Sequence, residues 1–422
     1  MKHLATIVLP LFCLIVSKSP LLANNNLYYC APNVHTLRTY VEGDEMSFPL
    51  IDLYGEERVV VEFDCLFASI LDLEYTIQHC SNNGTPSDLQ PSEYIEGFNV
   101  NSITNYESSI NTKTNYVNYR IAFPNDDVKM LLSGRYIVTI FEAGNPENVV
   151  ARTTFLVYEQ LATINVTIIK PQTAHNERHA HDIRISADYS NIHVTDVFAE
   201  LNLDILQNGN IRAGRQGLKP RQISGTQLVY SYASDLFLPG GNEFRMLDLR
   251  YLQKNTINYN RVEYIAPFFH VTPPADKSRA FEPYFNQYDQ NGQYLIYANS
   301  VNKQFDDYYR TSDYAFVHNT LETEPVLDGD VFIYGAFNNW QLDSTNMMQY
   351  NFDTKRYESN LFLKQGVYDY MYVVKNAYTQ QIDLERFEGS HAATSNNYLF
   401  LLFYKPTTAD YEQLIGALQI DN

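Results

Sequence analysis

Short runs in which apolar and polar residues alternate dominate this chain. The runs are rich in Val, Ile, Tyr, Phe and Thr and are separated by Gly, Asn, Asp and Pro; clear examples are 58–63, 75–78, 116–121 and 136–140. A period of two places successive side chains on opposite faces of a strand, and short strands at regular spacing are typical of β-sandwiches. The pattern therefore predicts an all-β fold of tandem immunoglobulin-like, early-set β-sandwich domains.

Aromatic content supports the same prediction. The chain has 34 Tyr and 24 Phe, which pack well on pleated surfaces. Helical spacing of apolar residues is rare, and the best example is the segment 407–418, where we expect a helix.

The first residues have the pattern of an export signal. A short basic start, an apolar run over 4–16 and a small residue, Ala23, before Asn24 predict a cleaved signal peptide at 1–23. No later segment is long and apolar enough for a membrane helix, so we expect no direct membrane insertion.

Changes in connector composition suggest three domains in the mature chain. Breaks fall at 158–163 and at 318–325, and the residues 273–276 form a Pro-rich elbow within the middle segment. We predict an N-terminal β-sandwich at 24–160, a middle β domain at 161–320 and a C-terminal early-set immunoglobulin-like domain at 321–422.

The charge of the chain argues against two classes of partner. Its net charge is −19, and loss of a signal peptide that carries Lys2 and Lys18 but no acids makes this −21. A field of this sign repels nucleic acid and anionic lipid, and we expect neither as a partner.

Motifs for catalysis or cofactor binding are absent from the sequence. It has no Gly-x-Ser-x-Gly elbow, no phosphate-binding Gly-rich loop and no His-Glu-x-x-His pair, and its acids are scattered. We therefore predict no catalytic residue, no cofactor and no enzymatic activity. One cluster, His175, His179 and His181, resembles metal ligands, but no third ligand accompanies the two imidazoles that share a strand face, so we predict no metal site.

Three cysteines remain after export: Cys30, Cys65 and Cys80. If 59–80 forms a hairpin, residue 65 faces roughly residue 73, so that Cys65 and Cys80 are not cross-strand partners. We expect Cys80 to be a buried free thiol; the pairing of Cys30 stays open.

A turn near the C-terminus offers one alternative function. The segment 331–340 ends in Phe337-Asn338-Asn339-Trp340 and resembles part of the sandwich of starch- and glycogen-binding modules. In such modules an exposed Trp stacks on the face of a sugar, and a side-chain amide hydrogen-bonds to sugar hydroxyls. Trp340 would take the first role and Asn338 the second. The competing interpretation, which we prefer, is structural: the turn closes a hairpin and Trp340 is mostly buried.

Three stretches, taken in order, resemble one protein family across nearly the whole mature chain. They comprise His79-Cys80, Glu96-Gly97-Phe98 and Gly134-Arg135-Tyr136; then Gly240 to Arg245; then the Trp340 turn with Glu388-Gly389-Ser390-His391 and Asn396-Asn397-Tyr398. Together they resemble the plug proteins of the type 9 secretion system. The chain departs from the family at Gly84, where members usually have Trp, so we expect the turn 82–84 to be packed differently.

The resemblance implies a protein-binding function. Plug proteins seat against the periplasmic mouth of a giant outer-membrane translocon barrel and seal it when no cargo shuttle is engaged. The chain is then expected in the periplasm, at the inner face of the outer membrane, as a monomer within a larger complex. The surface that contacts the barrel is not predicted. The main alternative is a carbohydrate-binding envelope protein that uses the C-terminal sandwich; an enzyme with dispersed carboxylates or a secreted cargo is less favoured.

Several motif residues are better explained by scaffold roles than by partner contact. We expect positive φ angles at Gly97, Gly134 and Gly241, and a partner for Arg245 in Asp248 or Glu243. Asn242 and the pair 111–112 can fix loop shape through hydrogen bonds to nearby backbone.

Overall fold

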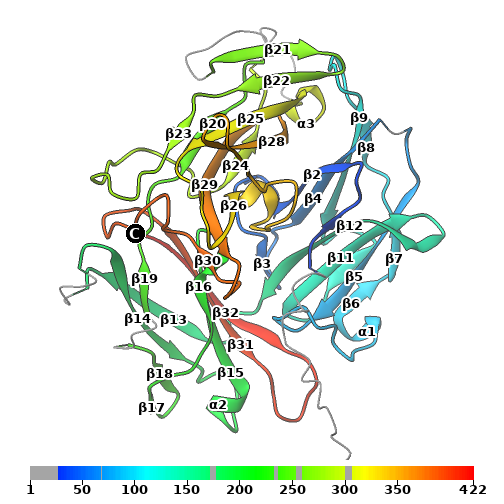
Figure 1. Ribbon diagram of the computed structural model, residues 1–422. Coiled ribbons are helices and arrows are strands. Elements are labelled where there is room, and N and C mark those ends of the chain that lie inside the picture. Colours follow the sequence, from blue (N-terminus) through cyan, green and yellow to red (C-terminus); the bar gives the residue numbers. More distant parts are fainter. Residues whose placement is uncertain (1–26, 68, 172–176, 232–235, 253–258, 300–306) are drawn as a thin grey trace, which may run out of the picture.

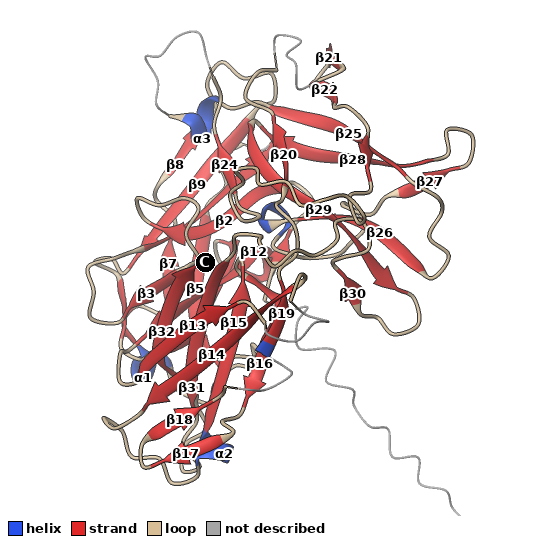
Figure 2. Cartoon of the chain, turned by 90° about the vertical axis from the view of Figure 1, so that its left-hand side faces the viewer, coloured by secondary structure: helices blue, strands red, loops and turns tan. Residues whose placement is uncertain are grey.

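The structure is a computed structural model that describes residues 27–67, 69–171, 177–231, 236–252, 259–299 and 307–422 (Figure 1). It contains 51% strand and 4% helix, and strands dominate the chain in Figure 2, which confirms the predicted all-β sandwich fold. None of the helices in these segments has the length and apolar content needed to cross a membrane. The predicted signal peptide, 1–23, lies outside the described residues.

Body 1, residues 27–158, is a sandwich of two main sheets. One sheet has the order β1 (Tyr29–Cys30), β12 (Asn145–Tyr158), β11 (Gly134–Glu142), β5 (Leu73–Cys80), β7 (Val100–Ser102), with β3 (Leu50–Asp52) beside β12. The other has the order β2 (Val34–Val41), β4 (Val59–Leu66), β9 (Tyr116–Phe123), β8 (Tyr106–Ser108). A small pair, β6 (Ile95–Gly97) and β10 (Val128–Met130), lies beside helix α1 (Pro91–Tyr94). The core between the sheets is aromatic; the rings of Tyr136 and Phe155, for example, stack at 5.2 Å.

Body 2 is a sandwich made from two distant parts of the chain, 163–239 and 397–421. Its first sheet has the order β13 (Thr163–Ile169), β14 (Ala180–Asp188), β18 (Gln227–Val229), β17 (Gln222–Ser224), with β19 (Phe237–Pro239) beside β14. The second has the order β16 (Asn210–Leu218), β15 (Leu201–Gln207), β31 (Asn397–Tyr404), β32 (Gln413–Asp421), and helix α2 (Val197–Glu200) precedes β15.

Body 3, residues 245–391, is inserted between these two parts. One layer is centred on the long strand β29 (Gly366–Asn376), which pairs with β20 (Arg245–Asp248), β24 (Tyr294–Ile296), β26 (Gly329–Tyr334) and β30 (Ile382–Asp383). The other has the order β21 (Arg261–Ile265), β22 (Phe268–Thr272), β25 (Tyr314–Glu322), β28 (Arg356–Lys364), β27 (Gln349–Asn351), with β23 (Asp276–Lys277) beside β25. Short helices α3 (Tyr308–Thr311) and η4 (Ala336–Asn338) lie in its connections.

The strand pairing departs from the predicted boundary near 320. That boundary cuts β25, and the segment 397–421 belongs to body 2, as the red strands beside green ones in Figure 1 show. The physical reason is burial on both faces of β31. Tyr398, Phe400 and Leu402 enter the core of body 2, while Leu399 and Leu401 pack against Leu156 and other residues of body 1.

Two local predictions are wrong for related reasons. The helix expected at 407–418 is instead a loop followed by β32, because pairing with β31 outweighs the helical spacing of its apolar residues. The hairpin expected at 59–80 does not form. Since β4 is buried at every position, it pairs on both sides with β2 and β9, and β5 joins the opposite sheet.

Candidate functional site

The structure places Trp340 at a junction between bodies, with most of its surface buried, as predicted. Its ring packs against Tyr334 at 5.1 Å and Phe244 at 6.1 Å, and its carbonyl accepts a hydrogen bond from Arg212 of body 2 at 2.9 Å. Asn338 donates to the carbonyl of Ile333 at 2.9 Å and accepts from the Gly335 amide at 3.3 Å. Both side chains of the sugar-binding hypothesis therefore have contacts within the turn and its surroundings.

The histidine cluster has protein partners where it is described. His175 lies outside the described residues. His179 donates from Nδ1 to the carbonyl of Ser390 at 2.8 Å, and His181 donates from Nε2 to that of Ala392 at 3.2 Å and accepts at Nδ1 from the Tyr398 hydroxyl at 2.7 Å. Burial lowers the pKa of His181, which favours its neutral form. Within the described segments, no group of three His, Cys, Asp or Glu residues could hold a metal ion.

The three described thiols are free. Cys65 and Cys80 are buried in opposite sheets of body 1, and burial raises the pKa of each to about 12. Cys80 is thus a buried free thiol, as predicted. Cys30 is half-buried and donates to the Tyr28 hydroxyl at 3.3 Å.

Bodies 1 and 2 meet at a buried polar cluster around Asn82. The Asn82 backbone amide donates to Glu412 at 2.7 Å, and its side-chain nitrogen Nδ2 donates to Asp204 at 2.5 Å. Arg135 donates to the side-chain oxygen Oδ1 of Asn82 at 3.0 Å. Burial raises the pKa of both Asp204 and Glu412. The apolar contact between β31 and Leu156 extends this junction.

At two glycines near this junction, Gly134 and Gly84, an added side chain would collide with neighbouring atoms. Gly134 has φ +141°, and a Cβ added there would lie 2.3 Å from His79 Nε2 and 2.9 Å from the carbonyl of Glu412. Gly97 and Gly241 also have positive φ, as predicted. Gly84 has φ +85°, and a Cβ there would lie 2.5 Å from the Leu27 side chain. Leu27 therefore occupies space beside the position where family members usually carry Trp.

Bodies 2 and 3 are joined by two chain crossings, 240–244 and 392–396. They are tied to the end of β14, because Gly240 donates to the carbonyl of His179 at 2.9 Å and Ala392 donates to that of Arg178 at 2.9 Å. On the body 2 side, Asn396 donates to the carbonyl of Gly240 at 2.9 Å. Two covalent crossings with these bonds hold the bodies in one arrangement.

A buried ion cluster lies just inside body 3, beside the crossings. Arg245 pairs with Glu388 at 2.9 Å and with Asp276 at 2.9 Å, and Arg279 pairs with Glu388 at 2.7 Å. Burial alone raises the pKa of Glu388, but the two arginines outweigh it and the pKa lies below its usual range. The predicted partners of Arg245, Asp248 and Glu243, are wrong. Asp248 instead pairs with Arg250 at 2.5 Å, and Glu243 accepts a hydrogen bond from Tyr284.

Bodies 1 and 3 share a buried ion pair. Lys364 Nζ lies 2.5 Å from Asp64, and their side chains are 1% and 0% exposed. Tyr314 donates to the same carboxylate at 2.6 Å. Burial raises the pKa of Asp64 and lowers that of Lys364. Nearby, the backbone amides of Lys113 and Thr114 donate to Asp313 at 2.6 and 3.0 Å.

An exposed loop in body 3, residues 278–293, carries three aromatic side chains in solvent. We call it the aromatic loop. Phe281 is 101% exposed, Phe285 74% and Tyr288 85%. Tyr284, between them, instead turns inward and donates to Glu243 at 2.5 Å. No motif in the sequence marks this surface; its one signal is a density of aromatic residues without a lysine or arginine over 280–299.

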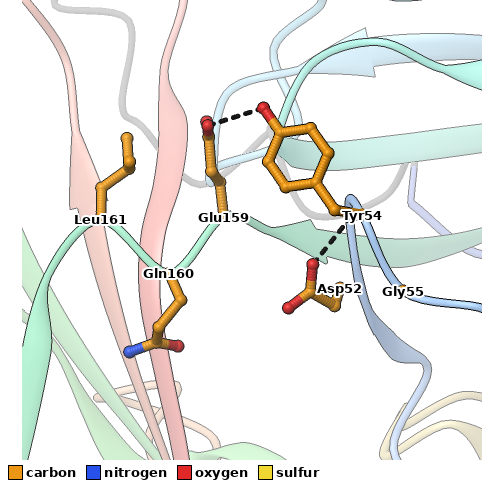
Figure 3. Close-up of a pocket in the computed structure, with 6 residues that line it drawn as sticks. All are labelled: Asp52, Tyr54, Gly55, Glu159, Gln160 and Leu161. Atoms are coloured by element: carbon orange, nitrogen blue, oxygen red, sulfur yellow. Dashed lines mark hydrogen bonds between the residues drawn. The ribbon is translucent and has the colours of Figure 1, made fainter.

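One open depression lies where bodies 1 and 2 adjoin (Figure 3). It has a volume of about 320 Å³ and is lined by Asp52, Tyr54, Gly55, Glu159, Gln160 and Leu161. The Tyr54 hydroxyl donates to Glu159 at 2.9 Å. This residue set has no paired acid and base aimed at a common point, so we assign no reaction to it.

Comparisons with known proteins found one family model and a similar solved structure. Residues 34–159 match a family model described as the type 9 secretion system plug protein first domain. A crystal structure at 2.30 Å resolution of a hypothetical protein from Parabacteroides merdae ATCC 43184 is similar to this chain with 30% sequence identity and a TM-score of 0.88. That match covers 93% of this chain and 98% of the other, so it extends over all three bodies. A search of the curated proteins found no match.

Proposed function

Because the chain belongs to the type 9 secretion system plug protein family, we propose that it is a non-enzymatic plug that seals the periplasmic end of the outer-membrane translocon channel. Its partner would be the translocon barrel protein. The chain would act as a monomer within that complex, at the inner face of the outer membrane.

One observation carries the proposal: buried polar contacts fix three sandwich bodies in a single block. A plug works by excluded volume, so its parts must not swing apart when the channel mouth exerts force. The Lys364–Asp64 pair, the Asn82 cluster and the double crossing between bodies 2 and 3 connect all three bodies. Breaking a buried ion pair is costly, which favours one arrangement of the bodies over a flexible chain of domains.

The charge of the chain is consistent with this role. A net charge of −19 favours solubility and disfavours binding to anionic lipid or nucleic acid. These properties suit a soluble body that reaches the barrel mouth from the periplasm.

Deletion of the gene tests the proposal. We expect the deletion strain to become sensitive to a large glycopeptide antibiotic that the intact outer membrane excludes, and we expect the full chain to restore exclusion. A matched control is the same chain without residues 1–23, which should not restore it if those residues direct export. A deletion strain that stays impermeable but no longer grows on a particular polysaccharide would contradict the plug proposal and favour the carbohydrate-binding alternative.

A further inference from the structure

The aromatic loop exposes three large aromatic side chains within a short stretch of sequence. Phe281, Phe285 and Tyr288 come from one short loop, the yellow-green segment at the left of Figure 1, and each is at least 74% exposed. Single exposed apolar side chains are common, but groups of them mark interaction sites. This group therefore needs an explanation that the fold alone does not supply.

An ion pair and several hydrogen bonds anchor the loop to body 3. Arg279 pairs with the buried Glu388 at 2.7 Å, and Gln287 donates to the carbonyl of Phe244 at 2.8 Å. The Phe244 amide donates to Asp289. At its far end, the amides of Gln290 and Gly292 donate to the buried Asp369. Residues on both sides of the three aromatic positions, and Gln287 between them, are thus bonded to body 3, while Phe281, Phe285 and Tyr288 themselves lie in solvent.

This arrangement suits docking to another molecule. An anchored loop loses little conformational entropy when it binds, and Phe and Tyr present a large contact area with few rotatable bonds. Buried aromatic anchors of this kind dominate the energetics of protein interfaces.

The charge of the aromatic loop favours a protein over a lipid surface as its binding partner. The segment 280–299 contains no lysine or arginine, and Glu282 is exposed beside Phe281. Loops that bind anionic membranes combine aromatic residues with basic ones, so this loop does not fit a lipid surface. The one cation within the loop, Arg279, is paired with the buried Glu388. The exposed carboxylate of Glu282 beside Phe281 fits a partner protein whose apolar pockets are bordered by basic residues.

We propose that the aromatic loop is the docking surface for the partner protein, with Phe281, Phe285 and Tyr288 inserted in apolar pockets of the translocon barrel or its periplasmic extension. The inference rests on the proposed function and names the surface that function uses. Truncating one anchor of this kind lowers affinity about 30-fold.

Site-specific photocrosslinking in cells tests the surface directly. Benzoylphenylalanine would replace Phe281 or Phe285 in one set of strains. Matched controls would carry it at Phe352 or Tyr378, which are 78% and 84% exposed on other turns of body 3. We expect a crosslink to the barrel protein from 281 and 285 and none from 352 and 378. Crosslinks from the control positions alone would overturn the docking surface but leave the plug proposal intact.

A triple variant supplies an independent measurement. Phe281→Ser, Phe285→Ser and Tyr288→Ser leave every anchor in place, so the purified variant should keep the melting temperature of the parent. We expect it to lose co-purification with the barrel and to reproduce the antibiotic sensitivity of the deletion strain, whereas a Phe352→Ser, Tyr378→Ser variant should do neither. Full exclusion by the folded triple variant would overturn the inference. So would binding of the purified parent, but not the variant, to phosphatidylethanolamine–phosphatidylglycerol vesicles, since that assigns the loop to lipid. If the deletion strain itself does not leak, the proposed function fails instead.

Discussion

Replacing Lys364 with Met isolates the contribution of the ion pair between bodies 1 and 3. Methionine preserves most of the side-chain volume, so the substitution removes the charge with little cavity. It leaves Asp64, whose side chain is 0% exposed, without its cation at 2.5 Å. It also removes a cation–π contact, because Lys364 Nζ lies 4.2 Å from the centre of the Tyr116 ring.

The size of the effect follows from these contacts. Removing one partner of a buried ion pair typically destabilises a protein by about 3–5 kcal/mol. Asp64 keeps two donors, the Tyr314 hydroxyl at 2.6 Å and the Asn118 amide at 2.8 Å, which places the expected loss near the lower end, about 3 kcal/mol. The double variant Lys364→Met, Asp64→Asn leaves no unpaired charge and should recover more than half of that loss.

Urea unfolding measures this loss. Fluorescence of Trp340, the single tryptophan, reports on body 3, while circular dichroism reports on strands of all three bodies. Lys170→Met is the matched control, because its pair with Glu177 is exposed, at 62% and 52%, and should contribute no more than about 1 kcal/mol. If Lys364→Met costs no more than this control, the pair is hydrated and the junction does not hold the bodies together.

Three further predictions concern single groups. Burial raises the pKa of Asp369 to about 7, so the folded chain retains a proton that the unfolded chain has released. Stability from this group is present at low pH and is lost as the pH rises from about 4 to about 7, by on the order of 4 kcal/mol at most; Asp369→Asn should remove that part of the pH dependence in urea titrations, and an unchanged dependence would refute the assignment. Iodide should quench Trp340 less in the folded chain than in urea, since its ring packs on two others; equal quenching would revive the sugar-stacking hypothesis. Cys65 and Cys80 should react with a thiol reagent only on unfolding, because both are buried and the pKa of each is about 12; rapid labelling of either in the folded chain would contradict their burial.

The sequence predicts local conformation well and strand partners poorly. Alternation in 116–121 and 136–140 identifies β9 and β11, because the side-chain period of a strand is a local property. The partner of a strand is not local. The run 398–403 is apolar throughout, which indicates burial on both faces, yet nothing within it specifies pairing with β15 or packing on Leu156. The predicted boundary near 320 failed for this reason.

The candidate surface shows the same limit. Phe285 and Tyr284 are adjacent aromatic residues with similar propensities, but Tyr284 faces Glu243 and Phe285 faces solvent. The difference depends on where Glu243 and Asp369 lie in three dimensions. Similarly, the two arginines that surround Glu388 come from distant segments of the sequence, so the Asp248 partner predicted for Arg245 from proximity was the wrong choice.

Because body 3 is inserted within body 2, body 2 can complete its folding only after body 3 has been made. Strand β15 pairs with β31, and Leu201 faces Tyr404 across the ladder. As the chain is synthesised, body 2 has only half of its second sheet until the whole of body 3 has followed. Bodies 1 and 3 can each fold from one continuous stretch of the chain. Strand β15, however, has one unpaired edge until β31 is present, and an unpaired edge can pair with the strand of another molecule. Folding of this protein therefore passes through a stage with an exposed strand edge that its compact final form does not reveal.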